Sequence, residues 1–214
     1  MHFFNKKQTF VNTVKIRKFG KPQKQAAPLT YDILTKLKNI CSDDIAGLRN
    51  KLLLQLDYET MHRRSEICQF KFEDLQNHGN HKHALFLRHS KTDQYNQGKI
   101  IPISVELSEM ISSWSLAIGH DSGYILRSFK RNLSTNLSLT PASINHILKS
   151  LQKQSGLNQI GELSVHSFRV GAALDLLDKN IPLEKIMLRG GWKSETSAMR
   201  YLQSWNDSNW LIIN

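Results

Sequence analysis

Residues 166–201 read HSFRVGAALDLLDKNIPLEKIMLRGGWKSETSAMRY, and the rest of the chain is organised around this stretch. Residues three apart on a helix share one face, so His166 and Arg169 are predicted to point into one pocket. A helix N-terminus carries partial positive charge, which favours an anion beside them. The pair Gly190–Gly191 is predicted to end one helix and to let the chain turn back toward the segment that carries Tyr201.

The composition is that of a globular protein with a strongly basic balance. Of the 214 residues, 40% are apolar and 22% are charged, and the formal net charge is +11. Such a charge points to a polyanion, most often nucleic acid, although a ribosomal or membrane-surface role also fits it. A guanidinium, an imidazole and a phenol in one pocket suit the attack of a tyrosine oxygen on a phosphodiester.

Several other classes of protein are disfavoured. Cys41 and Cys68 make neither a disulfide framework nor a zinc site, and we expect two reduced thiols. The histidines of HGNHKH, residues 78–83, match no known zinc spacing, so no metal is expected. No apolar run is long enough to span a bilayer, and no secretory signal is present. We expect an intracellular protein without a membrane partner.

Residues 1–28 form a basic segment that contains no acidic residue. Its cations are Lys6, Lys7, Lys15, Arg17, Lys18, Lys21 and Lys24. We interpret the segment as an arm or linker that ends at Pro28 and contacts DNA phosphates, which makes binding sensitive to salt. A solvated tail and an organelle presequence are the alternatives.

Helical spacing of apolar residues predicts a helix at residues 30–39 and a second helix that begins at residues 42–44. No glycine or proline interrupts residues 48–76, so one or two helices are predicted to pass through Arg63 and Glu66. These two residues lie three apart. They form either a surface ion pair, or a buried arginine whose spare donors Glu66 holds while its fork faces a phosphate.

The period of the apolar residues then changes to that of strands. Short strands are predicted at residues 70–75, 84–88 and 100–103, which together make a small antiparallel sheet. Lys91 sits where the second strand enters a turn, and a lysine in such a place is usually only solvated.

Two further helices and an apolar terminus follow. A buried stripe predicts a helix at residues 105–118, and a loop with a brief apolar segment at 124–126 comes next. Thr140 and Pro141 are a typical helix start, and the helix is predicted to run to about residue 154. The apolar tail at 206–214 either packs on its own core or docks on another protein.

Six features stand in a defined order along the chain. They are Arg63 with Glu66, Lys91 in a turn, His166, Arg169, Gly191-Trp192 and Tyr201. This ordered set resembles the catalytic domain of the tyrosine recombinases, the phage integrase family. RRSEI from Arg63 and SKT around Lys91 match the family pattern too, and Trp192 stands where most members have histidine. The resemblance covers about residues 29–213.

The resemblance implies an α+β, mainly helical catalytic domain over residues 29–205, with a small three-stranded antiparallel sheet. It implies site-specific DNA cleavage and rejoining, as in DNA recombination or integration, through a 3′-phosphotyrosine and without a cofactor. The implied partners are double-stranded DNA and further copies of the chain, as a tetramer on DNA and a monomer without it. Type IB topoisomerase-like relaxation and an inert DNA-binding fragment remain the alternatives. Family members normally carry an N-terminal clamp domain, so we expect a catalytic half or a chain without the clamp.

The resemblance also assigns roles to single residues. Arg63 and Arg169 would fork the non-bridging oxygens of the scissile phosphate, with Glu66 in support. His166 would orient the phosphate and accept the phenol proton of Tyr201. The catalytic set is completed by Lys91 as general acid for the 5′ oxygen and by Trp192 as a hydrogen-bond donor.

Overall fold

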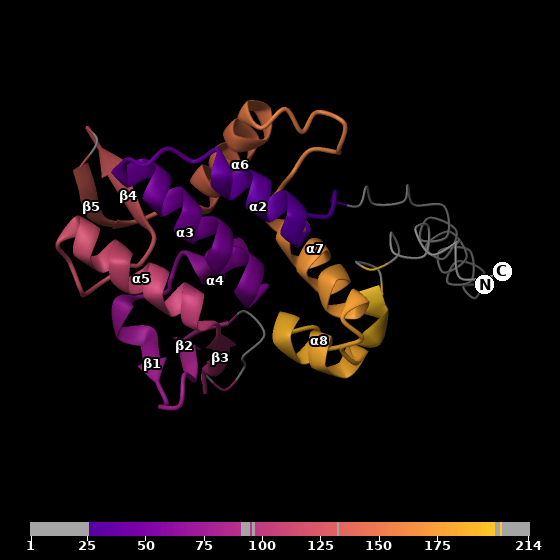
Figure 1. Cartoon of the computed structure of the whole chain (residues 1–214). Coiled ribbons are helices and arrows are strands. Elements are labelled where there is room, and N and C mark those ends of the chain that lie inside the picture. The colour runs from indigo at the N-terminus through magenta and orange to yellow at the C-terminus, as the bar shows by residue number, and fades with distance from the viewer. Residues whose placement is uncertain (1–25, 91–94, 96, 132, 200–201, 203–214) are drawn as a thin grey trace, which may run out of the picture.

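The computed structural model describes residues 26–90, 95, 97–131, 133–199 and 202 (Figure 1). The basic segment at residues 1–28 lies almost wholly outside these ranges, as does the tail at 206–214. The helices are α2 (Tyr31–Asn39), α3 (Ile45–Thr60), α4 (Arg64–Ile67), α5 (Val105–Ile118), α6 (Pro141–Gln154), α7 (Val165–Asp178) and α8 (Leu183–Gly190). A 3-10 turn, η1 (Phe72–Asp74), precedes β1 (Leu75–Asn77), β2 (His83–Leu87), β3 (Lys99–Ile103), β4 (Arg127–Lys130) and β5 (Leu133–Ser138).

The predicted three-stranded antiparallel sheet is present, in the order β1-β2-β3. Leu85 of β2 pairs with Leu75 of β1 and with Ile101 of β3, and Leu85 and Ile101 are buried. The first strand begins only at Leu75, because η1 occupies the preceding residues. The prediction of a strand from residue 70 was therefore wrong at its start.

A second sheet was not predicted. Strands β4 and β5 form an antiparallel hairpin in the stretch that the sequence indicated as a loop. Polar side chains stabilise it, since the hydroxyls of Ser128 and Thr135 are hydrogen-bonded at 2.7 Å. Leu133 and Leu137 of this hairpin are exposed, which leaves no alternating apolar pattern for a sequence to reveal.

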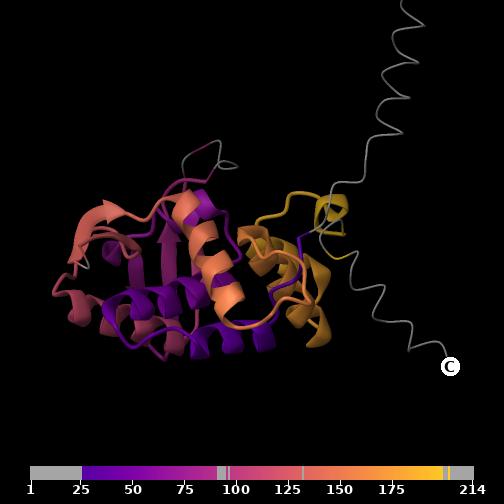
Figure 2. The same cartoon turned by 90° about the horizontal axis from the view of Figure 1, so that it is seen from above.

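Helix α3 is the centre of the core and packs against α2, α5 and α7. One apolar cluster joins α2, α3, α5 and α6, and a second joins α7, α8, Met61 and Trp192. Figures 1 and 2 show α7 and α8 at one end of the molecule and the β4–β5 hairpin at the other. Across the described ranges, we find no helix with the length and apolar character that crossing a membrane requires.

Two helices, the second of the two alternatives that the sequence left open, occupy this stretch, and the break between them lies just before Arg63. Helix α3 ends at Thr60, and Met61 adopts a left-handed conformation with φ 55°. A non-glycine residue tolerates this conformation only at some cost. Here the Met61 side chain is fully buried in the second cluster, and its N–H donates to Asp57 O at 3.0 Å. Arg63 therefore lies at the N-cap of α4 and not within a helix.

Close backbone packing fixes α7 against the N-terminal segment. A Cβ added at Gly171 would lie 1.8 Å from Leu29 O, so this contact requires glycine. The N–H of Leu29 donates to Ser167 O at 2.9 Å. The segment that leads into α2 is thereby held across the first turns of α7, beside His166.

Candidate active site

Glu66 is the buried carboxylate that organises one wall of the site. Its Oε2 accepts from the Arg63 N–H at 2.9 Å, and its Oε1 accepts from Arg63 NH1 at 3.2 Å and from Ser90 Oγ at 2.7 Å. The Glu66 side chain is 5% exposed, whereas that of Arg63 is 36% exposed. This arrangement lies between the two interpretations: Glu66 is buried and holds Arg63, as in the second, but the arginine itself is partly exposed.

The hydrogen bonds of Glu66 also determine its charge. Burial alone would raise the pKa of its carboxyl, but hydrogen bonds from the Arg63 N–H and Ser90 outweigh that effect, together with the charge of Arg63. The pKa of Glu66 therefore lies below its ordinary value, and the carboxylate is ionised at neutral pH.

The first turns of α7 carry the second wall. Ser164 is the N-cap of α7, and its N–H donates to Ser167 Oγ at 3.0 Å. His166 follows at the surface within the first turn, as predicted, and Arg169 lies one turn further along, only 3% exposed. His166 is thus presented outward while Arg169 lies beneath it.

The glycine corner closes over Arg169. Helix α8 ends at Gly190, and Gly191 takes a left-handed conformation with φ 67°, as the sequence predicted. The NH2 group of Arg169 donates to Gly190 O at 2.9 Å, and its guanidinium carbon lies 4.7 Å from the centroid of the Trp192 ring. A Cβ at Gly190 would lie 2.2 Å from the same ring. Glycine at 190 therefore allows Trp192 to stack on Arg169.

Positive charge converges on His166. Partial desolvation lowers the pKa of the His166 imidazole, and the charges of Arg169, Arg64 and Arg63 lower it further. The ring is therefore largely neutral at neutral pH, and a neutral imidazole nitrogen can accept a proton. The positive charge of these arginines also favours an anion near His166.

A layer of buried polar groups beneath this site was missed from the sequence. His62 is 4% exposed, and its Nδ1 is hydrogen-bonded to Thr60 O. Burial, with smaller effects from Lys99 and Arg169, lowers the pKa of His62 to about 4, so this ring is neutral. Lys99 donates to Leu188 O at 2.6 Å. The sequence His62-Arg63-Arg64 pointed to a cluster of basic residues here, but nothing in the sequence indicated that His62 is buried.

Asp57 lies in the same layer and is fully buried. Neither of its carboxylate oxygens has a hydrogen-bond partner among the residues that the structure describes. Burial raises the pKa of this carboxyl well above its ordinary value, and the charge of Arg169 offsets the effect only in part. Asp57 therefore keeps its proton to a higher pH in the folded protein than in the unfolded chain.

Replacing Asp57 by asparagine (Asp57→Asn) is expected to make the variant increasingly stable relative to the wild type as the pH rises. An unfolded aspartate ionises near a pKa of about 3.9, whereas the folded protein still holds the proton. The wild-type chain thus loses stability as the pH rises from the unfolded pKa through the folded pKa, and the variant does not. Thermal unfolding of both proteins between about pH 4 and pH 8 measures the difference in Tm. A variant destabilised more at the higher pH would show that Asp57 is instead ionised and paired with Arg169.

The structure thus brings Arg63, Glu66, His166, Arg169 and Trp192 into one site. Lys91 and Tyr201 lie outside the described residues, so their predicted places in this site stay predictions. Helical residues 195–199 follow the corner, and Leu202 beyond them is 2% exposed.

This fold is that of the tyrosine recombinase catalytic domain. The structure resembles that of a lambda integrase tetramer bound to a Holliday junction, with a TM-score of 0.64. The likeness covers 91% of this chain and 56% of that one, at 20% sequence identity. A family model described as the phage integrase family matches residues 28–207. The chain therefore belongs to the phage integrase family, as the sequence predicted.

Two curated relatives agree with this assignment. The chain is 28% identical over 198 residues to the integrase/recombinase xerD homolog of Selenomonas ruminantium, a match that covers 89% of this chain. It is 22% identical over 201 residues to recombinase cre of Escherichia phage P1, with 86% of this chain covered. In both cases the match spans 58% of the relative's length.

Proposed function

We propose that this chain is the catalytic part of a site-specific DNA recombinase, which cleaves and rejoins DNA strands through a 3′-phosphotyrosine at Tyr201. The observation that carries this proposal is the grouping of Arg63, held by Glu66, and Arg169, stacked on Trp192, with His166 in the first turn of α7. A cluster of guanidinium groups suits a phosphodiester, and the neutral imidazole beside it suits proton transfer. Membership of the phage integrase family supports the same conclusion.

The proposed reaction exchanges one phosphoester bond for another. The phenolic oxygen of Tyr201 attacks phosphorus, and the bond from phosphorus to the 5′ oxygen breaks. The phenol proton passes to His166, and Lys91 gives a proton to the departing 5′ oxygen. A phenol with a pKa of about 10 is mostly protonated at neutral pH, so it needs such a base. Attack by a 5′-hydroxyl on the phosphotyrosine reverses these steps and rejoins a strand.

The two arginines have different positions in this proposal. Arg63 is partly exposed and held by Glu66, so it contacts a non-bridging oxygen directly. Arg169 is nearly buried under Trp192 and adds positive charge from below, where a low dielectric strengthens its effect. Direct contact of Arg169 with the phosphate requires that the Trp192 corner opens. Trp192 contributes by covering Arg169 and by its indole N–H, which can donate to a phosphate oxygen.

Double-stranded DNA is the proposed substrate, and a homotetramer is the proposed assembly on it. The lambda integrase structure that this fold resembles is a tetramer on a Holliday junction, which supports both proposals. The cations of the segment at residues 1–28 are proposed to contact the DNA backbone. The tail at 206–214 is proposed to dock on a neighbouring copy, and the place of action to be the bacterial cytoplasm.

A covalent trap tests the proposed function without knowledge of the target site. The protein is incubated with fragmented DNA pooled from bacterial genomes and their mobile elements, adducts are recovered under denaturing detergent, and the DNA ends are sequenced. We expect adducts on 3′ ends at recurring sequences, with free 5′-hydroxyls opposite them. Tight binding without any adduct would identify a DNA-binding fragment. In a parallel incubation with supercoiled plasmid, relaxation by a monomer would identify topoisomerase activity.

A further inference from the structure

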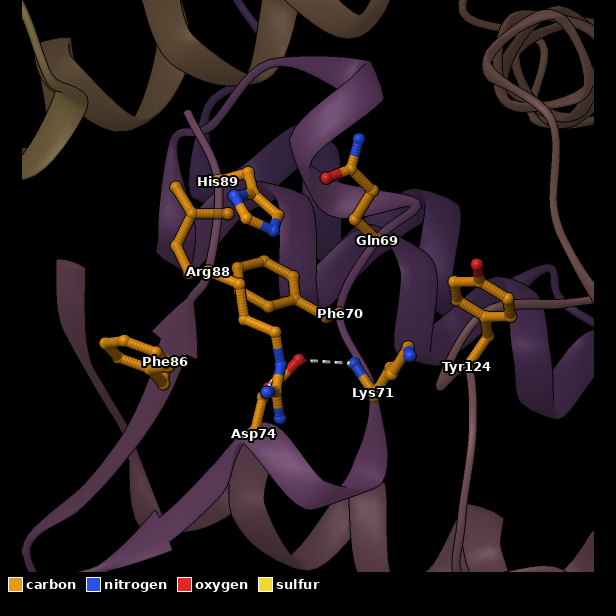
Figure 3. A pocket seen from close by; sticks show the side chains of 9 residues that line it. Gln69, Phe70, Lys71, Asp74, Phe86, Arg88, His89 and Tyr124 are labelled. Carbon is orange, nitrogen blue, oxygen red and sulfur yellow. Dashed lines mark hydrogen bonds and ion pairs between the residues drawn. The ribbon is translucent and has the colours of Figure 1, made fainter. Parts of the chain in front are cut away.

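A cavity of about 310 Å³ lies between the segment that follows α4 and the end of β2 (Figure 3). Its polar wall is made by Gln69, Lys71, Asp74, Arg88 and His89, and Tyr124 lines it as well. In Figure 3 the Arg88 side chain extends down to Asp74, and Lys71 lies between Asp74 and Tyr124. The mechanism proposed above uses none of these residues.

Asp74 is a buried carboxylate that holds two residues of the cavity in place. Its side chain is 2% exposed, and it accepts from the Lys71 N–H at 2.8 Å and from Arg88 Nε at 2.6 Å. A hydrogen bond to a buried carboxylate fixes the orientation of the Arg88 guanidinium. The Arg88 side chain is still 49% exposed, so its outer edge faces solvent.

The second cation is held by an aromatic ring. Lys71 Nζ lies 5.5 Å from the centroid of the Tyr124 ring, a cation–π contact. The backbones of Lys71 and Tyr124 are also joined by an antiparallel bridge. The ring restricts the ammonium group without neutralising it. Asp74 lines the cavity opposite these two cations, and the nearby Glu73 carboxylate also acts on both of them through its charge.

Residues of the same two chain segments line the cavity and the candidate active site. Gln69 and Lys71 follow α4 directly, one turn after Glu66, and His89 immediately precedes Ser90. The Ser90–Glu66 hydrogen bond of 2.7 Å joins these two chain segments. A strand whose scissile phosphate lies at Arg63 therefore runs close to the cavity. Phosphates recur about every 3.4 Å of helix axis along one DNA strand, so the strand carries further phosphates close to the scissile one.

We propose that this cavity binds a phosphodiester of the cleaved strand next to the scissile one, between Lys71 and Arg88. This inference rests on the proposed function, because it assigns a second contact to the same substrate. The fixed guanidinium supplies hydrogen bonds, and the ammonium supplies a point charge. Its role is to set the register of the strand at Arg63, since phosphate contacts position a protein on DNA.

The variant Lys71→Gln tests the proposal, because Lys71 makes no salt bridge among the described residues and its backbone contacts are kept; Glu73 acts on it through its charge alone. Affinity is measured with a labelled duplex of arbitrary sequence between about 50 and 200 mM salt. The slope of log K against log salt is expected to become less negative by about 0.9, which is the loss of one phosphate contact. Affinity at about 0.1 M salt is expected to fall about tenfold, by the same relation.

Two matched variants serve as controls. Lys71→Arg keeps the charge and is expected to restore the wild-type slope. Lys36→Gln removes an exposed lysine of α2, outside the cavity, and is expected to change the slope by less than Lys71→Gln does. A Lys71→Gln slope equal to that of the wild type would overturn the proposal.

A phosphate titration separates the two sources of this anion. Inorganic phosphate, added at constant ionic strength, is expected to bind weakly and to compete with the duplex for the wild type but not for Lys71→Gln. Phosphate binding with no competition would identify a site for free anions and reject the DNA contact. If the wild-type protein fails to bind DNA at all, the proposed function fails; if only the Lys71→Gln effect is missing, the cavity proposal fails alone.

Discussion

Replacing Tyr201 by phenylalanine (Tyr201→Phe) is expected to abolish the covalent adduct with DNA and to leave DNA affinity nearly unchanged. The phenolic oxygen is the proposed nucleophile, and phenylalanine differs from tyrosine by that oxygen alone. Affinity depends mainly on the many cations that contact phosphates, and this change removes none of them. Adducts are measured by denaturing gel electrophoresis, and affinity by the mobility shift of the same labelled duplex.

The matched control for this experiment is Tyr31→Phe. Tyr31 lies on α2 and is 52% exposed, so its hydroxyl is expected to be dispensable for cleavage. A detergent-stable adduct formed by Tyr201→Phe would show that another group is the nucleophile. Loss of the adduct together with loss of DNA binding would instead show that Tyr201 acts in folding or in assembly.

Replacing Arg63 by alanine (Arg63→Ala) is expected to slow cleavage by about 100- to 1,000-fold, or about 3–4 kcal/mol in the activation free energy. Arg63 is proposed to stabilise charge that grows on the phosphate oxygens as the reaction proceeds. The fold should survive the change, because Glu66 still accepts from Ser90 Oγ and from the backbone N–H of residue 63. The measurement is the single-turnover rate of adduct formation at saturating protein.

Arg64→Ala is the control for this second prediction, since it removes the same charge from the neighbouring position. Arg64 is exposed, and it acts on His166 through its charge. Its removal is therefore expected to slow cleavage far less than Arg63→Ala does. Equal rates for Arg63→Ala and the wild type would remove Arg63 from the site, and equal losses in both variants would reduce its role to that of general charge.

The parts of the fold that are determined by residues close together in the sequence were predictable. The helix at residues 105–118 was predicted with its observed limits, because its apolar stripe has a clear helical period and Ser104 caps it. The helix that starts at Pro141 and the corner at Gly190–Gly191 follow from the same local rules. The ordered catalytic set was likewise visible, since it consists of residue types at fixed spacings.

What failed depends on contacts between distant segments. The break at Met61 has no local signal, because methionine is a good helix former and its left-handed conformation is held by burial against α7 and α8. The burial of Asp57 and His62 and the partial burial of Lys99 could not be predicted either, since charged and polar residues are expected at the surface. Ser90 became part of the site through a hydrogen bond to a residue 24 positions away.

The Lys99 contact with α8 also bears on how this domain tolerates change. Lys99 opens β3, and its ammonium group donates to the last carbonyls of α8, to Leu188 O at 2.6 Å and to Arg189 O at 3.3 Å. These hydrogen bonds join the sheet directly to the helix that ends at the glycine corner. A displacement of β3 would therefore move the end of α8, and with it the Trp192 ring that stacks on Arg169.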